Sequence, residues 1–132
     1  MDLLIDTNVF VDVALSQAKA EEASEFFGRV SQFNLFISDF SLHSISVILI
    51  RQRRTEPLLK FYGDIIRTGF VRVLSIPEDE LGEVVVRAEK FGLDFDDAYQ
   101  YTLAEQHSLE IVSYDSDFDR TPRGRKTRAD FA

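Results

Sequence analysis

The sequence predicts an α/β fold in which a central, mainly parallel sheet of four or five strands lies between two layers of helices. Short apolar runs, typical of buried strands, alternate along the chain with longer segments of helical periodicity. Pairs of helical segments separate these runs, and such connections lead to parallel strands. The chain has 132 residues, of which 45% are hydrophobic, so one domain spanning 1–132 can bury a full core.

The first strand is predicted over residues 3–5, where three apolar residues are bounded by polar ones. A helix is expected directly afterwards, because apolar residues recur at helical spacing at Val9, Phe10, Val13 and Ala14. A second helix is predicted over 20–30 and a second strand over 33–38. Asp6 should therefore lie at the carboxyl end of a strand, immediately before a helix.

The middle of the chain predicts a helix over 41–53, since Leu42, Ile45, Ile48 and Leu49 share one face. A further helix is expected from about 56 to 67, ending near Gly69. The third strand is predicted over 70–74, and Pro77 closes it.

The last third of the chain begins with an amphipathic segment, 79–91, which Gly92 ends. Asp94 is the expected N-cap of a helix that reaches about residue 106. The fourth strand is predicted over 111–113, and the acidic segment 114–117 follows it.

The charge is unevenly distributed. The net charge is -8, yet the segment 120–128 contains five basic residues and no acid. An acidic body is unusual for a nucleic-acid-binding protein but is compatible with binding of divalent cations. The basic tail at about 120–132 could bind phosphates or an acidic partner, or could be a solvated terminus.

Several classes of protein are excluded or disfavoured. The chain has no Cys, so it has no disulfide, no thiolate metal site and no Cys nucleophile. No Gly-rich loop follows any predicted strand, which excludes P-loop and Rossmann nucleotide sites. The N-terminal segment lacks the features of a secretory signal, and the most apolar later run, 45–50, is too short to span a bilayer. We therefore expect a cytoplasmic protein without a membrane partner.

Three groups of aspartates are expected at one edge of the sheet. Ligands of open α/β sheets bind beyond the carboxyl ends of the strands. Two groups follow strands and one opens the last helix: Asp6; Asp94, Asp96 and Asp97; Asp115 and Asp117. Taken alone, each group could instead be a helix cap or a turn residue.

Carboxylates gathered at one site repel each other unless a cation neutralises them. Oxygen ligands without His or Cys favour Mg²⁺, Mn²⁺ or Ca²⁺ over Zn²⁺. Mg²⁺ held by a few carboxylates is suited to hydrolysis of phosphodiesters, because it lowers the pKa of water and stabilises charge on the phosphate oxygens.

Three segments resemble the motifs of PIN domains. Residues 4–9 (LIDTNV) resemble the opening motif, residues 95–98 (FDDA) the acidic motif at a helix start, and residues 112–118 (VSYDSDF) the closing motif. The length and the order of elements also match. The resemblance implies a three-layer α/β/α PIN-like fold and a Mg²⁺- or Mn²⁺-dependent ribonuclease, similar to the VapC toxins of bacterial toxin–antitoxin pairs.

The resemblance also implies the roles of individual residues. It assigns metal binding and catalysis to Asp6, Asp97 and Asp115, with Asp117 as an accessory metal-binding acid. Ligand or water orientation is assigned to Thr7, Asn8 and Ser113, while Asp96 competes with Asp97 for its role. The implied partners are single-stranded RNA, a cognate antitoxin and a second copy of the chain in a homodimer.

One position departs from the family pattern. PIN domains usually carry a Glu on the helix after the second strand, and Ser44 stands at that position here. Ser cannot supply a negative charge, so we expect weaker metal binding unless another group compensates. His43 and Asp39 are the nearby candidates, although each could have only a structural role.

Substrate contacts are less sharply defined. Arg51, Arg53 and Arg54 lie at the end of a predicted helix, where they could bind phosphates or simply interact favourably with the helix C-terminus. Tyr99 and Tyr101 could stack on bases or pack in the core.

Two other functions remain open. A catalytically weakened PIN-like module that binds RNA or a protein would account for Ser44 and the acidic body. A phosphotransfer domain fits poorly, because position 8 is Asn where a dehalogenase-like phosphatase needs Asp, and the third strand offers no Asp for a receiver domain.

Overall fold

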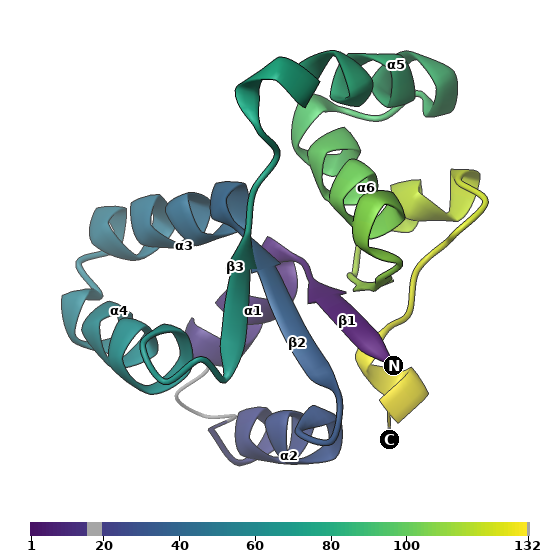
Figure 1. Cartoon of the computed structure of the whole chain (residues 1–132). Coiled ribbons are helices and arrows are strands. Elements are labelled where there is room, and N and C mark those ends of the chain that lie inside the picture. Colours follow the sequence, from purple (N-terminus) through teal and green to yellow (C-terminus); the bar gives the residue numbers. More distant parts are fainter. Residues whose placement is uncertain (16–19, 132) are drawn as a thin grey trace.

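The computed structural model describes residues 1–15 and 20–131 and has the three predicted layers (Figure 1). Its sheet has four parallel strands in the order β3-β2-β1-β4. The strands are β1 (Asp2–Ile5), β2 (Asn34–Ser38), β3 (Val71–Leu74) and β4 (Glu110–Val112). The predicted α/β class and the mainly parallel sheet are therefore confirmed.

In the described part of the chain, six α-helices connect the strands: α1 (Thr7–Leu15), α2 (Ala20–Val30), α3 (Asp39–Arg51), α4 (Thr55–Phe61), α5 (Leu81–Phe91) and α6 (Phe95–His107). The single helix predicted over about 56–67 is instead α4 followed by a π-helical turn, Tyr62–Ile66. Short 3-10 turns occupy Glu78–Glu80, Ser116–Arg120 and Arg128–Phe131. Val13 and Ala14 belong to the apolar spacing that predicted the first helix, but they lie outside the residues whose side chains are described.

Local signals explain where the helices next to the sheet begin and end. The Ser38 hydroxyl accepts a hydrogen bond from the Ser41 amide at 2.9 Å and so starts α3 two residues before the predicted boundary. Gly92 closes α5 in the left-handed conformation, with φ 63°, as predicted. Asp94 takes the N-cap position of α6, as predicted, although its side chain makes no capping hydrogen bond.

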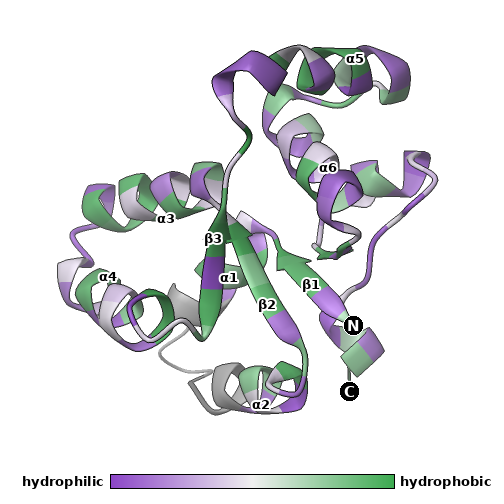
Figure 2. Cartoon of the chain, viewed as in Figure 1, coloured by the Kyte–Doolittle hydropathy of each residue, from purple (hydrophilic) through white to green (hydrophobic). Residues whose placement is uncertain are grey.

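Each strand alternates its side chains between two apolar clusters. Leu3 and Ile5 pack with residues of α1 to α4, whereas Leu4 packs with residues of α5 and α6 on the other face. β1 and β2 are hydrophobic over most of their length (Figure 2). Because both faces are covered, the carboxyl edge of the sheet is where polar groups can gather.

The strand order creates a switch point at that edge. The chain moves from β1 outward to β2 and β3, and then returns through α5 and α6 to β4 on the other side of β1. Crevices between the carboxyl ends of such neighbouring strands are the usual ligand sites of open α/β sheets. β1 and β4 therefore bring the segments after Ile5 and Val112 together.

The basic C-terminal segment folds back onto the body. Lys126 pairs with Val112 as an isolated parallel bridge beside β4. The Arg120, Arg125 and Arg128 side chains form ion pairs with acids of the same chain, and the Arg123 side chain donates to the Leu109 carbonyl. Within the described ranges, no helix has both the length and the apolar character needed to cross a membrane.

Candidate metal centre

Asp6 follows β1 and is held by hydrogen bonds from three sides. Its Oδ1 accepts from the Thr7 amide at 2.7 Å and from Gln100 Nε2 at 2.8 Å, while its Oδ2 accepts from Ser113 Oγ at 2.7 Å. The side chain is 7% exposed. Burial raises the pKa of Asp6, and the hydrogen bonds partly oppose that rise.

Asp97 lies in the first turn of α6 and is also buried. Its pKa is raised to about 8, first because burial removes the carboxylate from water, and then because the Asp115 carboxyl lies in hydrogen-bonding contact with it. The charges of Asp96 and Asp6 contribute in the same direction. Such a pair must share a proton or hold a cation, since two bare carboxylates in contact repel each other strongly.

Asp115 and Asp117 complete an acidic cluster with Asp97. One carboxylate oxygen of each of the three residues lies within 4.8 Å of the others. Asp115 Oδ1 also accepts from the Asp117 amide at 2.8 Å, so the turn role that its position suggested is present as well. Asp117 lies at the edge of the cluster, because it is less buried than Asp97, does not line the pocket and is ion-paired with Arg120 at 2.7 Å.

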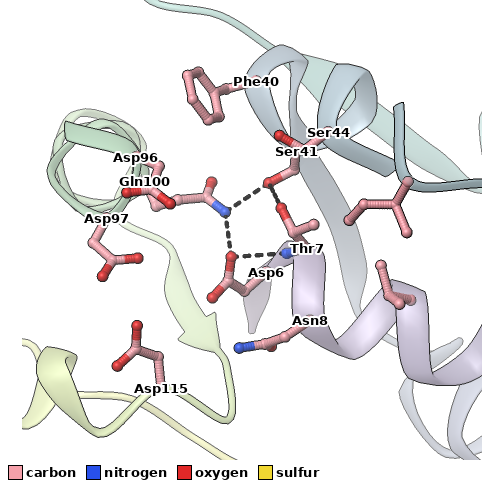
Figure 3. A pocket seen from close by; sticks show the side chains of 12 residues that line it. Asp6, Thr7, Asn8, Phe40, Ser41, Ser44, Asp96, Asp97, Gln100 and Asp115 are labelled. Carbon is pink, nitrogen blue, oxygen red and sulfur yellow. Dashed lines mark hydrogen bonds between the residues drawn. The ribbon is translucent and has the colours of Figure 1, made fainter. Parts of the chain in front are cut away.

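A pocket of about 450 Å³ opens over this cluster (Figure 3). Asp6 after β1, residues of α1 and α3 that include the first turn of each, the start of α6 and the loop after β4 line it. The first turns of three helices thus surround one cavity. Helix N-termini carry partial positive charge, which lowers the cost of gathering carboxylates and favours an anion such as phosphate beside them.

The predicted accessory residues lie at this centre. Ser113 Oγ donates to Asp6 and accepts from the Asp115 amide at 2.9 Å, so it links the two acids. Asn8 lies within 3.4 Å of the same hydroxyl, and Thr7 Oγ1 contacts Ser41 Oγ at 2.8 Å. Asp96 is exposed and lines the rim of the pocket, whereas Asp97 is buried and faces Asp115.

Ser44 lines the same pocket, so α3 contributes a hydroxyl where a carboxylate was expected. Neither neighbour takes its place. His43 is exposed and is not among the residues that line the pocket, and Asp39 accepts a hydrogen bond from Tyr99 Oη at 2.8 Å away from the cluster. The buried Tyr99 and Tyr101 side chains pack in the core.

The basic cluster is not part of this pocket. Arg51, Arg53 and Arg54 follow at the far end of α3, and none of them lines the cavity. Arg51 is seven residues beyond Ser44, which is about 10 Å along a helix axis. A role of these arginines in substrate binding therefore stays a prediction that requires a bound chain long enough to reach them.

Two buried polar residues at the site were not predicted. Ser41 and Gln100 line the pocket and are 1% and 3% exposed. A signal for Gln100 was present in the sequence, because it lies three residues after Asp97 and so shares its helix face. That signal was weak, since a Gln in a helix usually faces solvent.

The fold and the pocket define this chain as a parallel α/β domain with an all-oxygen acidic centre at its switch point. The model of the PIN domain family matches residues 3–124, so the chain belongs to that family. A search of curated proteins gave no significant match.

Solved structures of toxin–antitoxin proteins share the fold. A toxin–antitoxin complex from Klebsiella pneumoniae is similar over 96% of this chain and 97% of that one, with 20% identity and a TM-score of 0.72. VapBC2 from Rickettsia felis, bound to a promoter DNA fragment, is similar over 96% of this chain and 98% of that one, with 15% identity and a TM-score of 0.74. The sarcin–ricin loop cleaving toxin VapC20 from Mycobacterium tuberculosis is similar over 89% of this chain and 92% of that one, with 17% identity and a TM-score of 0.68.

Proposed function

We propose that this PIN domain is a Mg²⁺- or Mn²⁺-dependent endonuclease of single-stranded RNA. The observation that carries the proposal is the contact between the buried carboxyl of Asp97 and the half-buried carboxyl of Asp115, beside Asp6. A fold with no other need for such a pair would lose stability by keeping it. The pair is useful if a cation takes the place of the shared proton.

The donor set fits a hard divalent cation. The clustered groups are carboxylates, and the nearby groups are hydroxyls and amides, so all available ligand atoms are oxygen. Asp6, Asp97 and Asp115 would hold the ion, with Asp117 at the outer edge. When bound, the ion supplies Lewis-acid chemistry: it lowers the pKa of water and neutralises charge on the phosphate.

The chain's own residues would orient the reactants. Ser113 and Thr7 fix the Asp6 carboxylate by hydrogen bonds, and the first turns of α1, α3 and α6 direct partial positive charge into the pocket. A phosphodiester can therefore be bound next to the acids although the body of the chain is acidic. No covalent nucleophile is required.

A role as the toxin of a toxin–antitoxin pair is part of this proposal. It is supported by the fold shared with the Klebsiella and Rickettsia complexes and with VapC20, which is described as a toxin that cleaves the sarcin–ricin loop. A cognate antitoxin would then be the protein partner, and a homodimer the expected assembly. The alternative is a weakened module that binds RNA or a protein, which the hydroxyl of Ser44 in the pocket favours.

Cleavage of single-stranded RNA by the purified protein tests the proposal. We expect cutting in Mg²⁺ or Mn²⁺, none in EDTA, and none with Asp6→Asn in either metal. Metal-independent cutting, or unchanged cutting by Asp6→Asn, would reject the centre described above. A well-folded wild type that binds but never cuts a range of RNAs would favour the weakened binding module.

Restoring a carboxylate at position 44 should strengthen metal binding. Ser44→Glu adds a fifth acid to the pocket lining, and we expect a roughly tenfold lower Kd for Mn²⁺ in isothermal titration calorimetry, because affinity for hard cations rises with ligand charge. His43→Glu is the control, since it adds a carboxylate one residue away on an exposed side chain. Equal effects of the two variants would indicate a general charge effect rather than a ligand at position 44.

A further inference from the structure

Gln100 is a buried amide in the middle of the candidate centre. It lies one turn after Asp97 on α6, and its side chain is 3% exposed. Its Nε2 donates two hydrogen bonds, to Asp6 Oδ1 and to Ser41 Oγ, each at 2.8 Å. The residue therefore links α6 directly to the segments that begin α1 and α3.

These contacts form a closed ring (Figure 3). Asp6 Oδ1 is bonded to Gln100 and to the Thr7 amide, Gln100 is bonded to Ser41, and Ser41 Oγ is bonded to the Thr7 hydroxyl. The ring joins three parts of the fold that are far apart in the sequence. Networks of this kind restrict the orientation of every member, because moving one side chain breaks two bonds.

The ring determines which oxygen of Asp6 remains available. Oδ1 accepts two hydrogen bonds, from Thr7 and Gln100, and so uses both of its lone pairs. Oδ2 accepts one bond, from Ser113, and Figure 3 shows this second oxygen on the side of Asp97 and Asp115. One acceptor site of Oδ2 is thus left, on the oxygen that lies toward the acidic cluster.

The orientation of the amide follows from the charges around it. A carboxylate can only accept hydrogen bonds, so the NH₂ group of Gln100 must face Asp6. Gln100 Oε1 is consequently left buried with no hydrogen-bond partner in the described chain. Buried polar atoms almost always have a hydrogen-bond partner, and an apolar side chain of the same length would fill this space without leaving one unpartnered. A buried amide that is kept despite this cost indicates a functional requirement.

We propose that Gln100 is a positioning residue of the centre, which fixes the Asp6 carboxylate so that Oδ2 faces Asp97 and Asp115. Its role matters more here because α3 contributes Ser44 instead of a carboxylate, so the remaining acids must be well ordered to hold a cation. This inference rests on the proposed function. Groups that orient metal ligands in this way typically change metal affinity or activity 10- to 100-fold when they are removed.

The decisive comparison is between Gln100→Met and Gln106→Met. Both variants make the same nearly isosteric change on α6, but Gln106 is exposed near the end of the helix. Mn²⁺ affinity is measured by electron paramagnetic resonance, and kcat and KM are measured on a single-stranded RNA. We expect Gln100→Met to weaken Mn²⁺ binding at least about tenfold and to lower kcat with little change in KM, whereas Gln106→Met behaves as wild type.

A Gln100→Met variant that binds Mn²⁺ as tightly as Gln106→Met would overturn the positioning role while leaving the proposed function intact. A wild type that binds no Mn²⁺ would overturn both. If Gln100→Met does not fold, nuclear magnetic resonance on the wild type decides instead. The Gln100 side-chain amide protons should exchange slowly and shift when Mg²⁺ is added, whereas those of Gln106 should do neither; fast exchange at Gln100 would reject the ring.

Discussion

An Asp97→Asn variant should lose RNA cleavage by about 10²–10³-fold and, at the same time, be more stable than the wild type without metal. The loss corresponds to several kcal/mol of charge stabilisation that a held cation would otherwise supply. The gain in stability has the same origin. Asn replaces a carboxylate whose pKa is raised to about 8, first by burial and then by the contact with Asp115, and so removes both the buried charge and the like-charge contact.

The stabilisation should be at least about 1 kcal/mol, or about 3–6 °C in Tm for a domain of this size, in EDTA at pH 8. Asp94→Asn is the matched control, because it makes the same change three residues earlier at an exposed position that does not line the pocket. Circular dichroism melts and a cleavage assay measure the two effects. An inactive variant that is also less stable than the wild type would show that Asp97 acts mainly in folding.

The metal-free wild type should become less stable as the pH rises from about 4 to about 8. The pKa of Asp97 is raised in the folded chain, from 3.8 to about 8, and the pKa of Asp6 is raised as well. In this window the folded state retains protons that the unfolded state has released. Stability therefore falls with rising pH, by up to about 1.4 kcal/mol per pH unit for each such proton.

Divalent cations should reverse this dependence. Mg²⁺ or Mn²⁺ competes with the retained protons for the same oxygens, so the increase in Tm on adding metal should be larger at pH 8 than at pH 5. Thermal melts at several pH values, with EDTA and with Mg²⁺, measure both trends. Asp97→Asn should flatten the metal-free curve; a wild-type Tm that rises from pH 5 to pH 8 in EDTA would contradict the shared proton.

The two predictions describe one compromise. The contact that destabilises the metal-free fold is the feature that would bind a cation, and sites of function are where such conflicts with stability are retained. Ser44 leaves the pocket without the carboxylate expected at that position, and Gln100 orients the Asp6 carboxylate by a hydrogen bond without adding a charge. Cation binding would then depend on the orientation of a few acids rather than on a larger number of them.

Much of this arrangement could be predicted from the sequence. The α/β class followed from alternating apolar runs and helical segments, and the positions of Asp6 and Asp115 followed because parallel strands end at one edge of a sheet. Asp97 was expected at a helix start, and Ser44 was expected where it lines the pocket. Each of these inferences depends on local periodicity or on the order of elements, which the sequence states directly.

Other features were decided only by the tertiary structure. The orientation of Gln100 toward Asp6 depends on how α6 packs against β1, and residues 94 apart in the chain have no local signal for a hydrogen bond. The basic segment was expected to be free for a partner or solvent, whereas Arg128 pairs with Asp12, which is distant in sequence, and two further arginines of the segment pair with nearby aspartates. Local patterns determine which residues lie at the ends of helices and strands. The choice of side-chain partner depends on long-range packing, since burial and charge act through space rather than along the chain.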